Sequence, residues 1–299
     1  MTDRPSTRHD NAASGVPLET DIAVRVTDLH REFRRPRTRL FSAPPVVSAL
    51  AGVSLTVPTR SRFGVVGESG SGKTTLMRLI AGLDRATSGT VEVGGVDITA
   101  LTERNLGFLR RRLQVVFQDP MGSLDPRMSV RRIVAEPLLA QGKSNVDTRV
   151  VEVLEQVGLD AAAAGRYPHQ FSGGQRQRIS IARAIAPEPD ILIADEAVSA
   201  LDVTIRAQIL DLIESLCEQN ALTLIFVSHD LSVIRRMCDR VAVLRGGRVV
   251  ESGPTEQVYD DPQQDYTVQL LAAVPTLDRS LALARDRARA PGSQERGSG

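Results

Sequence analysis

The sequence contains no tryptophan and only two cysteines, and aromatic residues make up 3% of its 299 positions. Cys217 and Cys238 stand alone, without the CxxC spacing of metal or redox sites, which predicts two buried thiols. No apolar run is long enough to cross a bilayer, and the start of the chain lacks the apolar core of a signal peptide. We therefore expect a cytosolic protein.

A large net charge is also missing. The 37 lysines and arginines are nearly balanced by 36 aspartates and glutamates, which leaves a formal charge of +1. Charge alone therefore gives no reason to expect binding to nucleic acid or to an anionic membrane. Hydrophobic residues at 41% and charged residues at 24% are ordinary for a globular protein with a proper core.

A glycine-rich loop stands between an apolar strand pattern at 63–66 and a helical pattern at 75–82. Glycines let the backbone turn tightly, so that consecutive N–H groups point inward at the positive end of the helix. A polyphosphate fits there, because Lys73 can bridge the β and γ phosphates and the Thr74 hydroxyl can ligate Mg²⁺. The strand–loop–helix context disfavours the alternative, a Gly/Ser surface loop. The loop consists of Gly67, Glu68, Ser69, Gly70, Ser71, Gly72, Lys73 and Thr74.

A second pair of glycines follows Ser172, which is placed to cap a helix predicted to continue to residue 186. Gly173 and Gly174 leave several backbone N–H groups exposed at the start of that helix. This pattern predicts a second anion site, separate from the first. A flexible capped loop is the alternative, and the motif alone does not decide between the two.

Two adjacent carboxylates, Asp195 and Glu196, end the apolar strand pattern at 191–194. Because side chains alternate along a strand, we expect the two to point in different directions. One can then hold Mg²⁺ through its water shell while the other reaches an attacking water. His229 follows another apolar run at 222–227, where it could hydrogen-bond a γ phosphate, although a lone histidine is more often structural.

Hydrophobic periodicity predicts the remaining elements. Strands are expected at 22–26, 53–57, 89–93 and 113–117, with a hairpin at 241–250, and helices at 130–141, 148–157, 176–186 and 205–217. Phe33 follows the first strand, where an aromatic face could stack on a purine ring, although a lone phenylalanine is more often part of the core. Residues 1–20 are expected as a disordered leader and residues 276–299 as a disordered tail.

In their order along the chain, these motifs resemble those of an ATP-binding-cassette (ABC) ATPase over residues 22–253. The resemblance implies an α/β fold: a P-loop NTPase (RecA-like) core with an antiparallel β subdomain and an inserted α-helical subdomain at roughly 121–186. Residues 254–275 resemble a C-terminal extension found in part of that family. The motifs that carry the likeness are GESGSGKT, Gln118, SGGQ at 172–175, Asp195-Glu196, SALD at 199–202 and His229.

The resemblance also implies a role for each motif residue, with ATP and Mg²⁺ as cofactors. The implied catalytic residues are the general base Glu196, the γ-phosphate sensor His229, Gln118 and Lys73. Thr75 would reach the α phosphate and Phe33 would stack on adenine. The residues implied at Mg²⁺ are Thr74, Gln118 and Asp195.

A head-to-tail dimer follows from the same resemblance, and it would explain two phosphate sites in one chain. The family signature would close over ATP held by the opposite subunit, and Asp202 would belong to the adjoining D-loop. The signature residues are Ser172, Gly173, Gly174 and Gln175.

Longer strings are similar to the cassette subunits of the dipeptide, oligopeptide and nickel importer family. They are GESGSGKTTL, VFQDPMGSLDPR, RYPHQFSGGQRQRISIARA and DEAVSALDVTIRAQIL. This similarity implies an ATPase at the cytoplasmic face of a bacterial membrane, with a second cassette that is identical or related and two permease subunits. An extracytoplasmic solute-binding protein would act indirectly, and no nucleic acid partner is implied.

The chain departs from that pattern at a few places. Ala197 stands where the family usually has proline, and Arg62-Phe63 replaces Gly-Glu before the phosphate strand. The cysteine cluster that some relatives carry near the C-terminus is absent, so we expect no iron–sulfur site.

Two rival functions remain at this level. One is a soluble cassette protein acting on DNA or ribosomes, which the absence of a long coiled-coil insertion, of zinc-binding cysteines and of a second cassette disfavours. The other is a non-hydrolysing subunit that only completes a partner's site, which the full set of polar residues disfavours.

Overall fold

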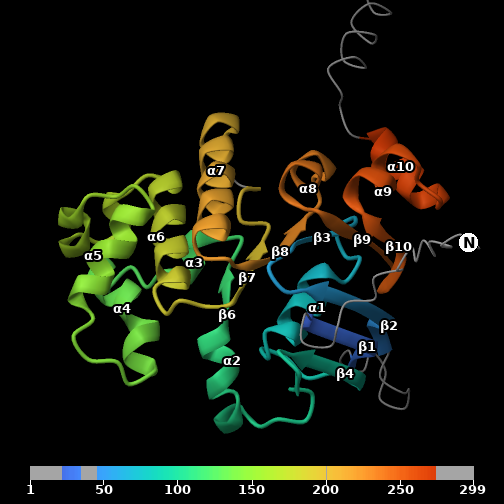
Figure 1. Cartoon of the computed structure of the whole chain (residues 1–299), viewed down its shortest axis with the longest axis horizontal. Coiled ribbons are helices and arrows are strands. Elements are labelled where there is room, and N and C mark those ends of the chain that lie inside the picture. The colour runs from blue at the N-terminus through green and yellow to red at the C-terminus, as the bar shows by residue number, and fades with distance from the viewer. Residues whose placement is uncertain (1–21, 35–45, 200, 274–299) are drawn as a thin grey trace, which may run out of the picture.

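The computed structural model describes residues 22–34, 46–199 and 201–273. They form two β-sheets with helices around them, and a group of helices lies to one side (Figure 1). The expected leader at 1–20, the expected tail at 276–299 and the arginine- and proline-rich segment after Arg34 lie outside the described residues.

The larger sheet has six strands in the order β10-β9-β3-β8-β7-β6. Strands β6, β7, β8, β3 and β9 run parallel, and β10 returns antiparallel as the predicted hairpin partner of β9. Every residue of β7 and β8 is buried, as expected for strands covered on both faces. The strands are β3 (Arg62–Val66), β6 (Leu113–Val116), β7 (Ile191–Asp195), β8 (Thr223–Ser228), β9 (Arg240–Arg245) and β10 (Arg248–Pro254).

The smaller sheet is antiparallel, in the order β2-β1-β4-β5. Its strands are β1 (Ile22–Arg34), β2 (Val46–Pro58), β4 (Ser88–Val93) and β5 (Val96–Asp97). The predicted pair at 22–26 and 53–57 was correct in position but much too short. β1 and β2 each have 13 residues. Their pairing continues through several register shifts, where the alternation of apolar residues is interrupted. Helix α1 (Lys73–Ile80) packs between the two sheets, and its buried residues share one core with both.

A group of helices lies to one side of the sheets, at the left of Figure 1. It contains α4 (Val130–Ala140), α5 (Asp147–Gln156) and α6 (Gly173–Ile185), which pack on one another within the segment expected as a helical insertion. The short helix α3 (Pro120–Ser123) and the 3-10 turn Ala161–Gly165 pack on this group, and the 3-10 turn Pro168–Gln170 comes just before α6. Helix α2 (Gly107–Arg112) and the 3-10 turn Glu103–Asn105 lie next to each other, with α2 below β6 in Figure 1.

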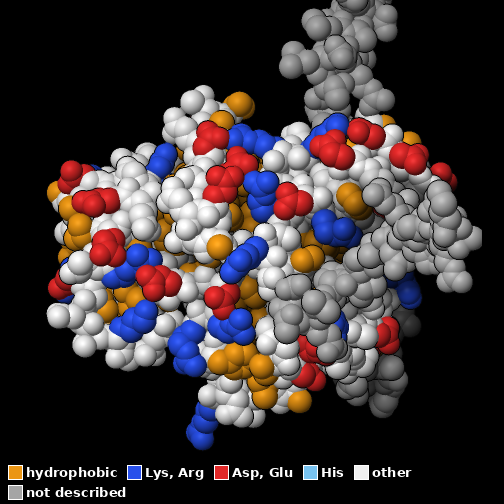
Figure 2. Space-filling view, viewed as in Figure 1, with side chains coloured by type: hydrophobic (Ala, Val, Ile, Leu, Met, Phe, Trp, Pro, Cys, Tyr) orange, Lys and Arg blue, Asp and Glu red, His pale blue; other side chains and the backbone are white. Residues whose placement is uncertain are grey.

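The last helices are α7 (Val203–Gln219), α8 (Leu231–Met237), α9 (Thr255–Asp260) and α10 (Asp265–Ala273). Cys217 and Cys238 are buried free thiols, which confirms the prediction from their spacing. Among the described residues, no helix combines the length and the apolar character needed to cross a membrane. On the face shown in Figure 2, acidic and basic side chains are interspersed, in keeping with the balanced charge.

Candidate active site

The glycine-rich loop connects β3 to α1 as predicted, and it is packed so tightly at Gly67 and Gly72 that neither position has room for a side chain. Gly72 caps α1 in the left-handed region, with φ at 107°, and a Cβ there would lie 2.6 Å from the Ala49 carbonyl oxygen. At Gly67 a Cβ would lie 2.2 Å from the Leu244 carbonyl oxygen. The loop thus winds against β2 and β9 and leaves the N-terminus of α1 facing outward.

Lys73 is folded back over this loop and is only 5% exposed. Its Nζ donates to the carbonyl oxygens of Gly67 at 2.7 Å and Glu68 at 2.9 Å. An ammonium group has three protons, so one remains for a further acceptor. Burial lowers the pKa of Lys73, and the nearby carboxylates of Glu196 and Asp195 oppose that shift.

Asp195 ends β7 and is 5% exposed, and its Oδ1 has no hydrogen-bond partner within the described residues. Burial, reinforced by the charge of Glu196 and opposed by Lys73, raises the pKa of Asp195 to about 6. A buried carboxylate oxygen without a partner is costly unless a cation or a proton satisfies it. The Ser71 hydroxyl is a second buried oxygen without a partner at this loop. Both observations fit a hard cation such as Mg²⁺.

Glu196 lies just beyond the strand, and here the structure corrects the argument from strand alternation. The residue adopts a left-handed conformation with φ at 46°. Its N–H donates to the Val227 carbonyl at 2.9 Å, which holds the turn against β8. A non-glycine residue in this region is strained, and such strain concentrates at functional sites.

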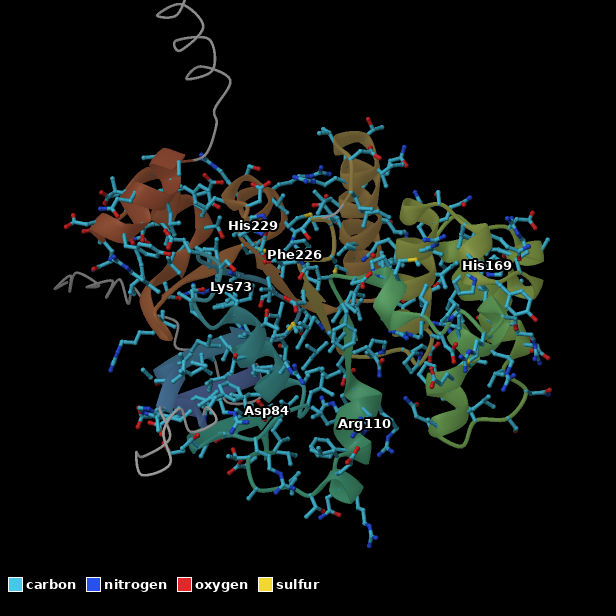
Figure 3. The ribbon with its side chains drawn as sticks, turned by 180° about the vertical axis from the view of Figure 1, so that it is seen from behind. Lys73, Asp84, Arg110, His169, Phe226 and His229 are labelled. Carbon is cyan, nitrogen blue, oxygen red and sulfur yellow. The ribbon has the colours of Figure 1, made fainter. Side chains whose placement is uncertain are left out.

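His229 joins Glu196 at the carboxyl end of the parallel sheet. The His229 Nδ1 lies 3.2 Å from the Glu196 Oε1, with 57% of the histidine side chain and 18% of the glutamate side chain exposed. Figure 3 shows Lys73 and His229 on the same part of the molecule. The structure therefore brings Lys73, Asp195, Glu196 and His229 to one edge of the sheet, where open α/β folds bind their ligands.

The other predicted loop and metal residues surround this group. Thr74 is the second residue of α1 and is exposed, Thr75 is half-buried, and Ser69 and Gly70 lie exposed at the tip of the loop. Gln118 is exposed after β6, and its Nε2 donates to the Ser199 Oγ at 3.4 Å. Ser199 in turn donates to the Glu196 carbonyl at 3.0 Å, so Gln118 is linked to the strained turn.

The predicted second anion site lies in the helical group and is not in contact with the first. Ser172 caps α6 through a reciprocal pair of bonds: its Oγ accepts from the Gln175 N–H at 3.3 Å, and the Gln175 Oε1 accepts from the Ser172 N–H at 3.0 Å. Ser172, Gly173 and Gln175 are exposed and Gly174 is half-buried. His169, three residues before Ser172, lies far from Lys73 in Figure 3. Asp202 caps α7 by accepting from the Ile205 N–H at 2.9 Å.

Phe33 is 40% exposed near the end of β1, so it is not a core residue. The Arg31 guanidinium carbon lies 4.4 Å from the Phe33 ring centroid and covers one face of the ring. Arg31 itself is fixed by two bonds to the Asp84 carboxylate at 2.8 and 3.1 Å. Arg31 was not predicted as a site residue, although its place two residues before Phe33 on the same strand was a usable signal.

The pattern of motifs and their geometry agree with a known family. A family model described as ABC transporter matches residues 50–199. The chain belongs to the ABC transporter family.

Curated relatives have names that refer to peptides. The chain is 47% identical over 263 residues to the oligopeptide transport ATP-binding protein OppD of Mycobacterium tuberculosis, covering 87% of this chain and 43% of that protein. It thus spans less than half the length of that relative. It is also 45% identical to the oligopeptide transport ATP-binding protein OppF of Streptococcus mutans, covering 80% of this chain and 79% of that protein.

Solved structures confirm the fold. The chain matches a dimeric ATP-binding cassette in a post-hydrolysis state with ADP and Pi, with a TM-score of 0.69 and 29% identity over 78% of this chain and 98% of that chain. It also matches CbiO1 of Clostridium perfringens, part of the CbiONQ transporter complex, with a TM-score of 0.70 and 25% identity over 89% and 99% of the two chains. The expected combination of a parallel core sheet, an antiparallel sheet and helices is therefore confirmed as an ABC ATPase fold.

Proposed function

We propose that this chain is the ATP-hydrolysing, nucleotide-binding subunit of an ABC importer for peptides. The observation that carries the proposal is the grouping of Lys73, Asp195, Glu196 and His229 beside the loop at 67–74. This grouping supplies a cation for phosphate, a carboxylate for a metal and a base with an adjoining histidine.

ATP binds with its phosphates against the loop amides and the free proton of Lys73. Asp195 and Thr74 would hold the accompanying Mg²⁺, with Gln118 nearby, and the metal would supply positive charge to the phosphates. Adenine stacks on the face of Phe33 that Arg31 leaves uncovered.

Hydrolysis is an in-line displacement. The oxygen of a water forms a bond to the γ phosphorus while the bond to the β–γ bridging oxygen breaks, and Glu196 takes a proton from that water. His229 lies against Glu196, where its ring orients the carboxylate and can sense the γ phosphate. Most of the rate enhancement comes from positioning and charge neutralisation.

The exposed signature at Ser172 completes the ATP site of a second cassette chain, identical or related, in a head-to-tail dimer. The main support is that the α6 N-terminus is open to solvent and distant from the loop of its own chain. ATP-driven closure of this dimer moves two permease subunits at the cytoplasmic face of a bacterial membrane. The names of the relatives support a peptide cargo. An extracytoplasmic solute-binding protein would deliver that cargo to the permease.

The test is uptake of labelled di- and oligopeptides, and of Ni²⁺, in a host that carries this chain as its only cassette for the system. A chromosomal Lys73→Ala substitution should abolish peptide uptake and leave Ni²⁺ uptake unchanged. Lys143→Ala is the matched control, because it alters the chain's other lysine, which is exposed and follows α4 in the helical group. Unchanged peptide uptake in Lys73→Ala would refute the proposal. If only Ni²⁺ uptake were lost, the transported solute would be nickel and not a peptide.

A further inference from the structure

A residue of the last described helix touches the phosphate loop. Tyr266, in α10, is 5% exposed, and its hydroxyl oxygen accepts a hydrogen bond from the backbone N–H of Glu68 at 3.3 Å. The two residues are 198 positions apart, so this contact joins the segment that follows the hairpin to the loop at 67–74. In Figure 1, α9 and α10 lie beside the β9–β10 hairpin.

The peptide group that Tyr266 contacts is the same one that Lys73 contacts. The Glu68 N–H and the Gly67 carbonyl belong to one planar peptide unit. The carbonyl accepts from the Lys73 Nζ at 2.7 Å while the N–H donates to the Tyr266 hydroxyl. Hydrogen bonds at both ends of a peptide group fix its orientation and polarise each other. The Tyr266 hydroxyl is therefore linked to the ammonium group at the phosphate site through a single peptide unit.

The Tyr266 side chain is itself held in place. The Arg245 guanidinium carbon lies 4.6 Å from the Tyr266 ring centroid. The residue before it, Leu244, presents the carbonyl oxygen against which Gly67 packs. The end of β9 thus lies against Tyr266 and against Gly67, the residue before Glu68. The chain just before α10 is tied to β10, because the N–H groups of Gln263 and Gln264 donate to the Glu251 carboxylate at 2.8 and 3.3 Å.

We propose that Tyr266 is a positioning residue for the phosphate site: its hydroxyl orients the Gly67–Glu68 peptide, and that peptide holds the Lys73 ammonium toward the bound phosphates. The segment after the ATPase core is therefore part of the nucleotide site. This inference rests on the proposed function, in which the loop at 67–74 binds ATP.

The effect falls on binding more than on chemistry. Lys73 contacts phosphate before and during the reaction, so a misplaced Lys73 weakens ground state and transition state alike. Loss of the hydroxyl should raise KM for ATP and leave kcat within about twofold of the wild type. One hydrogen bond of this kind corresponds to about 3- to 10-fold in affinity.

The experiment compares Tyr266→Phe with Tyr259→Phe in the full chain. Tyr259 is the matched control, because its ring also lies beside an arginine and its hydroxyl also forms a hydrogen bond with a backbone group. That group is the Leu231 carbonyl on α8, to which the Tyr259 hydroxyl donates. Both variants keep the ring and lose one hydroxyl bond, so both should lose a similar amount of thermal stability. Affinity for the non-hydrolysable analogue AMPPNP with Mg²⁺ is measured by calorimetry, together with exchange of the Glu68 amide by NMR.

Tyr266→Phe should bind the analogue about 3- to 10-fold more weakly than Tyr259→Phe, and its Glu68 amide should exchange faster. Equal affinity in the two variants, or an unchanged Glu68 amide, would overturn the inference. Failure of the proposed function would look different, because the wild-type chain itself would then not bind the analogue.

Discussion

The chain offers two helix N-termini to anions, at α1 and at α6, and their surroundings differ. The α1 terminus has a buried lysine, Lys73, and a buried carboxylate, Asp195, whose Oδ1 has no partner in the part of the chain that the structure describes, and its loop is packed against two strands. The α6 terminus is capped by its own Ser172 and Gln175 and is open to solvent. We propose that the two termini serve two purposes: the α1 terminus is a complete binding site, and the α6 terminus is a surface that needs a ligand held by another chain.

The largest expected effect separates binding from chemistry at the α1 site. Glu196→Gln removes the base and keeps the size of the side chain, so turnover should fall about 10³-fold (~4 kcal/mol) while ATP remains bound. Steady-state ATPase rates and ATP retention in gel filtration measure the two properties. The control is Glu218→Gln, an exposed acid on α7. Turnover at the wild-type rate in Glu196→Gln would remove Glu196 from the role of base.

The next effect concerns how the free energy of unfolding depends on pH. We expect it from Asp195 at the α1 site and not from the α6 site. The folded pKa of Asp195 is about 6, above the ordinary value of 3.8, so the folded chain holds a proton that the unfolded chain has released between these pH values. Without a metal, stability should therefore fall as pH rises from about 4 to about 6 and stay low above that range. Asp195→Asn removes this loss and should stabilise the protein at pH 7 by on the order of 2 kcal/mol.

Denaturant unfolding in EDTA at pH 5 and pH 7 checks the Asp195 prediction. The control is Asp261→Asn, an exposed acid that should leave the difference between the two pH values unchanged. If Asp195→Asn is less stable than the wild type at pH 7, the charged Asp195 carboxylate does not destabilise the metal-free protein, and the prediction is wrong.

The smallest effect concerns the base of the nucleotide. Phe33→Ala should weaken ATP binding about tenfold, because stacking on an aromatic ring contributes about 1–3 kcal/mol. Phe33→Tyr should bind ATP as the wild type does, since it keeps the ring and the Arg31 contact. Calorimetric titration of the three proteins gives the comparison. Equal affinity in the wild type and Phe33→Ala would place adenine elsewhere.

Local motifs made most of the α1 site predictable. The strand–loop–helix order placed Lys73 and Thr74, and the apolar runs before Asp195 and His229 placed them at the carboxyl ends of neighbouring strands. Gly82, just after α1, has φ at 64°, the left-handed conformation that is common where a glycine ends a helix. These features depend on residues close together in the sequence.

What escaped prediction depends on long-range packing or on local strain. Nothing in the sequence pattern indicated the left-handed turn at Glu196, which β8 imposes through the Val227 carbonyl. The contact between Tyr266 and Glu68 joins elements whose relation is fixed only when β9, β10 and α10 are assembled. The length of β1 was underestimated because bulges interrupt its alternation.

The central claim is that the α1 site binds ATP of its own chain and the α6 site serves ATP of another chain. The most direct test compares Lys73→Ala with Ser172→Arg, measuring ATP affinity of the isolated chain and turnover of the assembled transporter. The account predicts that Lys73→Ala loses both, whereas Ser172→Arg keeps wild-type affinity and loses only turnover. An equal loss of affinity in the isolated Ser172→Arg chain would contradict it.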